Sequence, residues 1–359
     1  MMANESESIL VEKYDCIARQ LTIYGGIILF ILCLFGTLMN MLTFAQPTYQ
    51  RRPSSFYLLL ASIFDLAHLT PGSITNILQY GFHYDWTINS IIYCRLKTYF
   101  VYVFTIISGT LTILANIDRY LLSSNNSKRW NYSSHSIAKR LIVSTISFWL
   151  ILSIPMIFCT TRYYHSSHNE QMICSNPSMD SICLIVRIFY TCLFDGFFPP
   201  LIMLIFGLVT YRNVHQLHRR SNFRSLSARR INQQIIFMLI LQSIKSSFAS
   251  MPYSFFHTYW LITRNKPKTH LDEAKENLAM QIVYLLFWSN YTSFFIYLFS
   301  SEIFRSQWKK GVKKLVCCLY GSRRRRHTKC EIELKRLNYA QNTKEILAHQ
   351  QIDEELGEH

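Results

Sequence analysis

The sequence predicts an all-α integral membrane protein, a seven-transmembrane helix bundle with a short amphipathic eighth helix. Charged residues make up only 16% of the 359 residues, whereas a soluble protein carries about 25%. The apolar residues are gathered in blocks, and residues 141–161 and 277–301 contain no Asp, Glu, Lys or Arg. A bilayer core needs roughly 20 apolar residues in one helix. Each block is long enough to cross a membrane, and a helix pairs its own backbone amides in hydrocarbon.

Seven segments of this kind follow one another, joined by short loops without a second soluble domain. In order, they cover about residues 21–45, 55–80, 95–122, 138–161, 183–210, 232–262 and 277–300. The basic and apolar stretch that follows, "FRSQWKKGVKKLV", is typical of an amphipathic helix lying along a membrane surface.

Positive charge is concentrated in alternate loops. Lys and Arg gather after the first, third and fifth segments, and thirteen more follow Ser301. Because such residues accumulate in cytoplasmic loops, we expect the N-terminus outside and the C-terminus inside. An odd number of segments agrees with both placements. A basic stripe beside a membrane favours membrane lipid as the partner, and not nucleic acid.

This topology divides the chain into four parts. Residues 1–20 are polar and lack the features of a signal peptide, so they form an extracellular N-terminal segment in which Asn4 begins a glycosylation sequon. We expect the bundle over 21–301, the amphipathic helix over 302–318 and a disordered cytoplasmic tail over 319–359.

The cysteines can be sorted by the same topology. Cys94 and Cys174 face an oxidising compartment, where disulfides persist, and Cys16 lies on that side without an obvious partner. Cys317 and Cys318, beside the basic helix, suit palmitoylation, although two reduced bystanders are an equal alternative. Four further cysteines lie in or near the segments and are expected to be packing residues: Cys33, Cys159, Cys183 and Cys192.

The third segment ends on Asp118-Arg119-Tyr120, after an uncharged run from Thr98 to Ile117. Cys94 precedes Arg119 by 25 residues. With seven segments and an outside N-terminus, this pattern resembles the rhodopsin-like (class A) G-protein-coupled receptors over about residues 20–318, and most resembles the neuropeptide-receptor group.

Further positions match the family's pattern one by one. The matching residues are Asn40, Asp65, Trp86, Trp149, Pro199 or Pro200, Pro252, Tyr297 and Phe304. The resemblance implies an extracellular ligand and a cytoplasmic heterotrimeric G protein. It also implies a coupling switch in which Asp118 restrains Arg119 at rest, Tyr120 shapes the second inner loop, and Tyr297 acts from the seventh segment.

Three positions depart from the family's pattern. Ser250 stands where the tryptophan of the sixth segment is expected, and Gly207 or Leu208 where the fifth usually has a tyrosine. The seventh reads Ser293-Phe294-Phe295-Ile296-Tyr297, without the Asn and Pro of the motif. Because proline lets a helix kink, we expect a straighter seventh segment.

Charged residues within a membrane segment are functional candidates. The resemblance places Asp65 in a buried polar site that can hold a sodium ion, with further oxygen ligands from Asn40, Ser108, Ser289 and Asn290. Lys245 lies at an overlapping depth. One hypothesis is that its ammonium approaches Asp65 and partly replaces the ion, and the alternative is that it snorkels towards the cytoplasm.

The ligand class follows by exclusion. Val101 stands where amine receptors carry an aspartate, and no lysine lies between Asn277 and Ser301 to bind retinal. Amine and retinal are therefore disfavoured. The outer loop 162–182 is long enough for a polar lid held by Cys174, which favours a peptide. Asp195 is a candidate for a basic ligand group, or for an internal Lys, Arg or His.

These observations favour a receptor in the plasma membrane. A receptor-like scaffold that no longer couples to G proteins is the main alternative, because of the altered sixth and seventh segments. A transporter is less favoured, since no inverted repeat is visible. No metal-ligand cluster, phosphate loop or nucleophile motif appears in the sequence, so neither an enzyme nor a metal site is expected.

Overall fold

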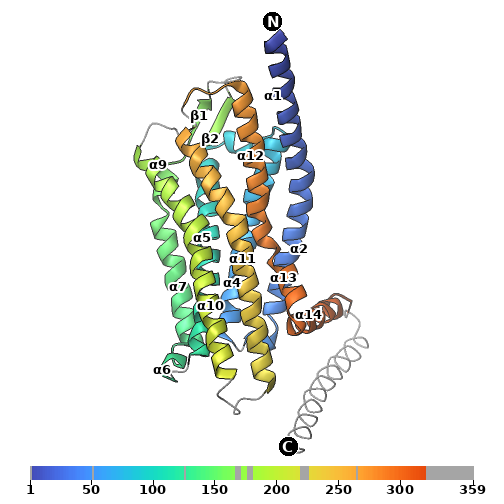
Figure 1. Ribbon diagram of the computed structural model, residues 1–359, viewed down its shortest axis with the longest axis vertical. Coiled ribbons are helices and arrows are strands. Elements are labelled where there is room, and N and C mark those ends of the chain that lie inside the picture. The colour runs from blue at the N-terminus through green and yellow to red at the C-terminus, as the bar shows by residue number, and fades with distance from the viewer. Residues whose placement is uncertain are drawn as a thin grey trace, which may run out of the picture.

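The protein is a bundle of membrane-spanning helices (Figure 1). The computed structural model describes residues 2–320 apart from positions 51, 125–126, 166–170, 176–180, 219–225 and 264–265. In this part of the chain, seven helical stretches are long and apolar enough to cross a membrane, which confirms the predicted fold class. These spans one to seven are Glu7–Phe44, Pro53–Gly81, Ile91–Ser123, His135–Phe158, Ile182–Asn213, Gln234–Thr263 and His270–Ser300.

Several spans contain more than one helical element. Spans one and two comprise α1 (Met2–Gln20), η1 (Leu21–Gly25) and α2 (Gly26–Phe44), then α4 (Pro53–Asn76) and η2 (Ile77–Gly81). Span three is α5 (Ile91–Ser123), and span four comprises α7 (His135–Leu152) and α8 (Pro155–Phe158). Span five comprises α9 (Ser181–Ile188), η4 (Phe189–Phe197) and α10 (Phe198–His218). Spans six and seven comprise α11 (Leu226–Thr263), then α12 (His270–Trp288), η5 (Ser289–Thr292) and α13 (Ser293–Ser300). The shorter connections are α3 (Pro47–Gln50), η3 (Trp86–Ile88) and α6 (Ser127–Trp130).

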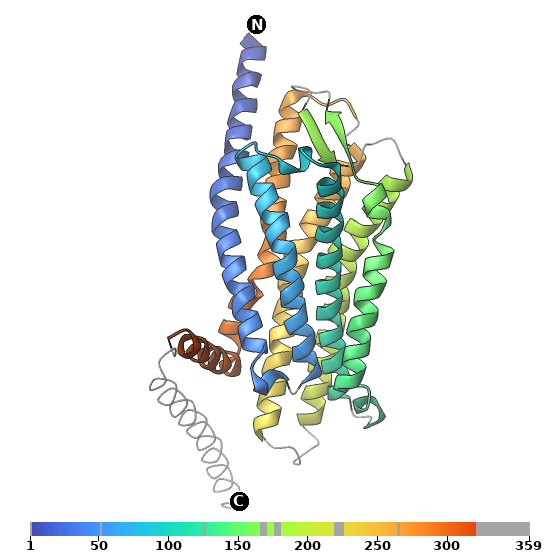
Figure 2. The same ribbon diagram turned by 180° about the vertical axis from the view of Figure 1, so that it is seen from behind.

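The two ends of the bundle differ. At one end, strands β1 (Thr161–His165) and β2 (Gln171–Ser175) pair antiparallel, with Thr161 opposite Ser175. We call this the hairpin end. The opposite end carries Arg119 and the helix α14 (Glu302–Tyr320), which lies across the bundle (Figures 1 and 2). We call it the Arg119 end. The sequence predicted a polar lid over 162–182 but not its strands.

Two disulfides hold the hairpin end. Cys94 in α5 is bonded to Cys174 in β2, with their Cα atoms 5.8 Å apart, as predicted. Cys159 and Cys183 are also bonded, with Cα atoms 5.3 Å apart. The prediction that Cys159 and Cys183 are packing residues was wrong. The end of span four and the start of span five flank the hairpin in the sequence and lie close enough in space for the bond to form. The hairpin is therefore covalently tied at its base and at its second strand.

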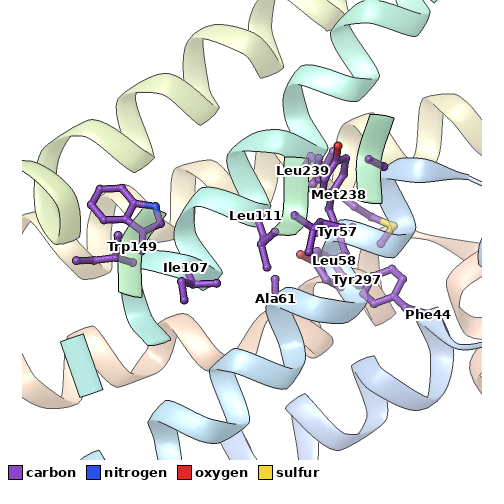
Figure 3. Close-up of a cluster of buried hydrophobic side chains, with 14 of the residues drawn as sticks. Phe44, Tyr57, Leu58, Ala61, Ile107, Leu111, Trp149, Met238, Leu239 and Tyr297 are labelled. Atoms are coloured by element: carbon purple, nitrogen blue, oxygen red, sulfur yellow. The ribbon is translucent and has the colours of Figure 1, made fainter. Parts of the chain in front are cut away.

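The core lies between the spans, and apolar side chains also cover the outside. A large buried cluster joins all seven spans and includes Leu58, Leu111, Trp149 and Met238 (Figure 3). Other large apolar side chains are exposed, such as Phe299 at 80%. A monomeric soluble protein rarely exposes large apolar surfaces, so this surface fits a lipid environment. Between helices in lipid, packing and hydrogen bonds replace the hydrophobic effect as the source of stability.

Spans one and seven begin well before their predicted starts, at Glu7 and His270 instead of about residues 21 and 277. Span one extends back into α1, where Arg19 donates to the Gly81 carbonyl at 3.0 Å. Span seven starts at His270 because Thr269 caps α12: its hydroxyl accepts from the Asp272 amide at 3.2 Å. Hydroxyl caps satisfy amides that lack a partner in the first turn. The apolar pattern alone could not show this polar extension.

Span seven is interrupted although it lacks the expected proline. A 3₁₀ segment, η5, separates α12 from α13, so the α-helix of this span is not continuous, and the straighter axis stays a prediction. Side chains that hydrogen-bond to backbone carbonyls compete with the helical ladder and bend helices. Four such bonds surround the break: Cys33 to Trp288 at 3.3 Å, Lys245 to Asn290 at 2.8 Å, Ser289 to Leu286 at 2.6 Å and Thr292 to Ser289 at 2.6 Å.

The eighth helix, α14, packs one face on the bundle. Phe304, Gln307 and Gly311 are buried, and positions spaced three and four apart share one face of a helix. Gln234 of α11 accepts hydrogen bonds from the Ser301 hydroxyl at 2.8 Å and from the Ile303 amide at 3.1 Å. Span six is therefore joined directly to the start of α14.

Spans five and six approach closely at Gly196. A Cβ atom built on Gly196 would lie 2.0 Å from the Ser254 Oγ and 2.2 Å from its Cβ. The Ser254 hydroxyl donates to the Thr191 carbonyl at 3.1 Å. Only glycine allows this contact, because a serine Cβ cannot rotate out of the way.

We predict that Gly196→Ala lowers the free energy of unfolding by about 1–3 kcal/mol, the usual cost of overpacking. Gly109→Ala is the control, since the nearest atom to its added Cβ is 3.9 Å away. Thermal melting of both variants in detergent micelles measures the difference. Equal melting temperatures would contradict the close approach of spans five and six.

Candidate functional site

The candidate site at the Arg119 end is built around a buried ion pair. Arg119 and Asp118 are 3% and 5% exposed, and Arg119 Nη2 lies 3.1 Å from Asp118 Oδ2. Arg119 also donates to the Ser54 hydroxyl at the start of span two. The second carboxylate oxygen of Asp118 accepts from the Ser133 hydroxyl at 2.5 Å. Both ions are therefore held by neutral groups as well as by each other.

A second cation lies close to this pair. Arg52, in the loop between spans one and two, is partly buried. Burial, and then the like charge of Arg119, lower the pKa of Arg52 to about 10. Its guanidinium is still charged at neutral pH and repels Arg119. The buried position of Arg119 therefore depends on attraction by Asp118.

Tyr120 contacts the loop between spans three and four. Its hydroxyl accepts from Arg129 at 2.8 Å, and the guanidinium carbon of Arg129 lies 5.7 Å from the ring centroid. On the other side, the ring meets Phe206 of span five edge to face, with centroids 5.4 Å apart. Tyr120 thus links this loop to span five.

Tyr297 lies between span one and the eighth helix. It is 3% exposed, and its ring centroid is 5.8 Å from that of Phe44 and 5.6 Å from that of Phe304. Figure 3 places Tyr297 beside Phe44 and Leu58. A displacement of span seven would therefore change the packing of α14.

Polar side chains continue from this end into the middle of the bundle. Asp65 of span two accepts a hydrogen bond from the Ser108 hydroxyl of span three. Asn40 of span one donates to the Ser293 hydroxyl at 3.2 Å. Ser293 stands where the family motif carries asparagine, so a serine makes the contact between spans one and seven at this point.

Lys245 bridges spans six and seven. Its ammonium donates to the Asn290 carbonyl at 2.8 Å, and the Asn290 amide donates to the Ser250 hydroxyl at 2.9 Å. Lys245 and Asp65 attract each other electrostatically, but no ion pair within 4.0 Å joins them in the described part of the chain. Lys245 thus points into the bundle and contacts span seven. We call these three residues the Lys245 bridge: Lys245, Asn290 and Ser250.

The polar site around Asp65 fits the ammonium of Lys245 better than it fits a sodium ion. Of the expected oxygen ligands, Ser108 contacts Asp65, but Ser289 donates within its own helix at 2.6 Å. The side-chain oxygens of Asn290 and Asn40 are buried without a hydrogen-bond partner, which is the feature of this site that would suit a bound cation. The positive charge of Lys245 nearby opposes a second cation. Among the described residues, no group of three or more His, Cys, Asp or Glu could hold another metal.

Other predicted positions are located but not tested. Asp195 lies in η4 and Asn4 in α1, and both side chains fall outside the described residues, as does that of Cys318. Cys317 is near the end of α14, is partly buried and is disulfide-bonded, and palmitoylation of Cys317 and Cys318 stays a prediction. Cys16 is exposed and unbonded.

Sequence reasoning missed three polar partners of the site, Ser54, Ser133 and Gln234. Each lies in a loop or near a span end. A lone Ser or Gln at such a position carries no distinguishing sequence signal.

The fold and this site define a seven-helix membrane receptor. A family model described as 7 transmembrane receptor (rhodopsin family) matches residues 36–297, which is most of the chain. The chain therefore belongs to the rhodopsin family of seven-transmembrane receptors, whose members generally act in signalling and not as enzymes. Comparison with curated proteins gave no match.

We predict that Lys245 makes the receptor insensitive to sodium. Wild type should melt at the same temperature in sodium chloride and in choline chloride at equal ionic strength. Lys245→Ala should melt about 2 °C or more higher in sodium, because the ion can then bind beside Asp65. Lys309→Ala, which removes an exposed charge from α14, is the control. A sodium response in wild type as large as in Lys245→Ala would refute this account.

Proposed function

We propose that the protein is a plasma-membrane receptor that transmits the binding of an extracellular peptide to a cytoplasmic heterotrimeric G protein. The observation that carries this proposal is the buried Asp118–Arg119 pair, which sits at one end of the bundle while a disulfide-tied hairpin covers the other. Family membership supports a receptor role in general. The peptide, the coupling and the orientation are our inference.

The orientation follows from charge. The loops at the Arg119 end hold most of the clustered Lys and Arg residues, so this end faces the cytoplasm. The hairpin end, with its two disulfides, faces an oxidising exterior.

The hairpin supports a peptide ligand. It is tied at the base by Cys159–Cys183 and at β2 by Cys94–Cys174. A hairpin fixed in this way across the end of the bundle suits a ligand that extends above the helices and makes backbone contacts with the hairpin. Val101 and the lack of a lysine in residues 277–301 disfavour an amine or retinal.

Activation then requires specific contacts to break. At the Arg119 end these are the bonds of Arg119 to Asp118 and Ser54, and those of Gln234 to the start of α14. The Lys245 bridge joins spans six and seven deeper in the bundle. A ligand favours the open form only by binding it more tightly than the resting form. Release of Arg119 would expose it to the G protein.

A second candidate is a receptor-like scaffold that does not couple. It is favoured by Ser250 in place of the usual tryptophan and by Ser293-Phe294 in place of Asn-Pro. The interruption of span seven and the Lys245 bridge favour a functional activation switch that uses residues other than those of the family's pattern. Nucleotide exchange separates the two candidates.

We expect wild type to catalyse nucleotide exchange on at least one member of a G-protein panel when a neuropeptide library is applied. Arg119→Ala should abolish this exchange at matched surface expression. Asp118→Asn should raise exchange without ligand, because Arg119 loses its ionic partner.

Arg140→Ala is the matched control, since Arg140 is exposed near the same end, and it should leave the response intact. Silence in wild type and Arg119→Ala alike, despite good expression, would favour the scaffold.

A further inference from the structure

Two basic side chains lie in the hairpin half of the bundle, away from the Arg119 end. Lys97 is in α5, about one helical turn after the disulfide-bonded Cys94. Arg187 is in the last turn of α9, in the span that begins beside Cys183. Both are partly buried. Basic residues within a span are costly and are functional candidates.

Arg187 is directed into the bundle and not towards lipid. It is hydrogen-bonded to Tyr102 of span three and interacts electrostatically with Tyr253 of span six and Tyr284 of span seven. Tyrosines of three other spans therefore lie within electrostatic range of its guanidinium. Its Nε atom is buried and has no hydrogen-bond partner. Guanidinium groups have five donors in a planar fork that matches a carboxylate.

Neither cation forms an ion pair with an acidic side chain that the structure describes. Asp85 attracts Lys97, but its carboxylate caps η3 by accepting from the Thr87 amide at 2.8 Å and hydroxyl at 2.5 Å. The tyrosine hydroxyls around Arg187 supply lone pairs but no negative charge.

The two cations also repel each other. Partly buried charges without a counter-ion are unfavourable unless something else neutralises them. His68, a further titratable group near Lys97, adds no negative charge. In the described part of the chain, two positive charges thus lie near each other in the hairpin half of the bundle, and no carboxylate there forms an ion pair with either of them.

Aromatic rings line the same region. The Tyr253 ring lies 5.4 Å from that of Tyr284 and 4.6 Å from that of Phe287, centroid to centroid. A ligand whose anionic group lies beside an aromatic or apolar group would meet both kinds of partner here.

We propose that Lys97 and Arg187 bind a carboxylate of the peptide ligand, either its free C-terminus or an acidic side chain. The proposal rests on the proposed function for the peptide and names its chemistry. Arg187 binds the carboxylate through its fork, with Tyr102 orienting the guanidinium, and Lys97 adds a second positive charge. An amidated, wholly basic peptide would lack this interaction.

The first test uses the purified full-length receptor in detergent micelles and needs no G protein. The probe is hippurate, an acylated glycine with an aromatic ring and a free carboxylate, compared with its neutral amide at equal ionic strength. Hippurate should raise the melting temperature of wild type more than the amide does. Arg187→Gln and Lys97→Gln should weaken hippurate binding about tenfold or more, the usual effect of losing a charge-assisted hydrogen bond.

A second readout needs no ligand. If the two charges are unpaired, Lys97→Gln should raise the melting temperature of the ligand-free receptor, whereas a structural role for Lys97 would lower it. Lys275→Gln is the control, because it removes an exposed charge from α12 near the same end; it should change neither result.

Equal shifts with hippurate and the amide in wild type, or a lower ligand-free melting temperature in Lys97→Gln, would overturn the proposal. A positive hippurate result with no nucleotide exchange would leave the anion site standing and count only against the coupling function.

Discussion

The arrangement of the Arg119 end of the bundle depends on the positive charge of the Arg119 guanidinium. A charge removed from water must be paired and hydrogen-bonded, and removing one partner of a buried pair costs about 3–5 kcal/mol. The partners of Arg119 come from its own helix and from span two, at Asp118 and Ser54. Ser133 then satisfies the remaining carboxylate oxygen from the next loop. One buried cation thus fixes spans two and three and the loop after them.

Spans six and seven are held by a second set of polar contacts. The Lys245 bridge joins them in mid-bundle, and Gln234 joins span six to the beginning of α14. The sequence lacks the family's tryptophan and Asn-Pro at these positions, yet span seven is still interrupted. Serine, threonine and lysine side chains that bind backbone carbonyls produce the break without proline. An interruption of the helix can therefore arise from different residues, because it depends on which donors the backbone carbonyl groups hydrogen-bond to.

Much of the fold could be predicted because membrane helices have strong length and composition requirements. The apolar blocks located all seven spans, and the Asp118–Arg119 pair was found at the end of its span. The N-terminal extension of span seven could not be found, since it depends on the Thr269 cap and not on hydropathy. The Cys159–Cys183 bond was missed because it depends on how two span ends meet in space.

The polar contacts inside the bundle were only partly predictable. The resemblance to the family placed Ser108 near Asp65, and depth along the helices brought Lys245 to an overlapping level. The electrostatic attraction between Lys245 and Asp65 agrees with this. The hydrogen bond of Lys245 to the Asn290 carbonyl depends on the interrupted backbone of span seven, which side-chain patterns do not describe. The lack of an ion pair at Lys97 and Arg187 among the described residues was not identified either, because a missing counter-ion can be recognised only in three dimensions.

The central claim is that the buried pair of Arg119 and Asp118 holds the Arg119 end of the bundle closed. The most direct test is a distance measurement between spin labels at Lys139 in span four and Phe237 in span six, two exposed positions near that end. Bioorthogonal labels avoid the ten native cysteines. The account predicts a longer distance in Asp118→Asn than in the receptor with Asp118 intact, both measured without ligand. The same distance distribution in both, with the variant still folded, would contradict it.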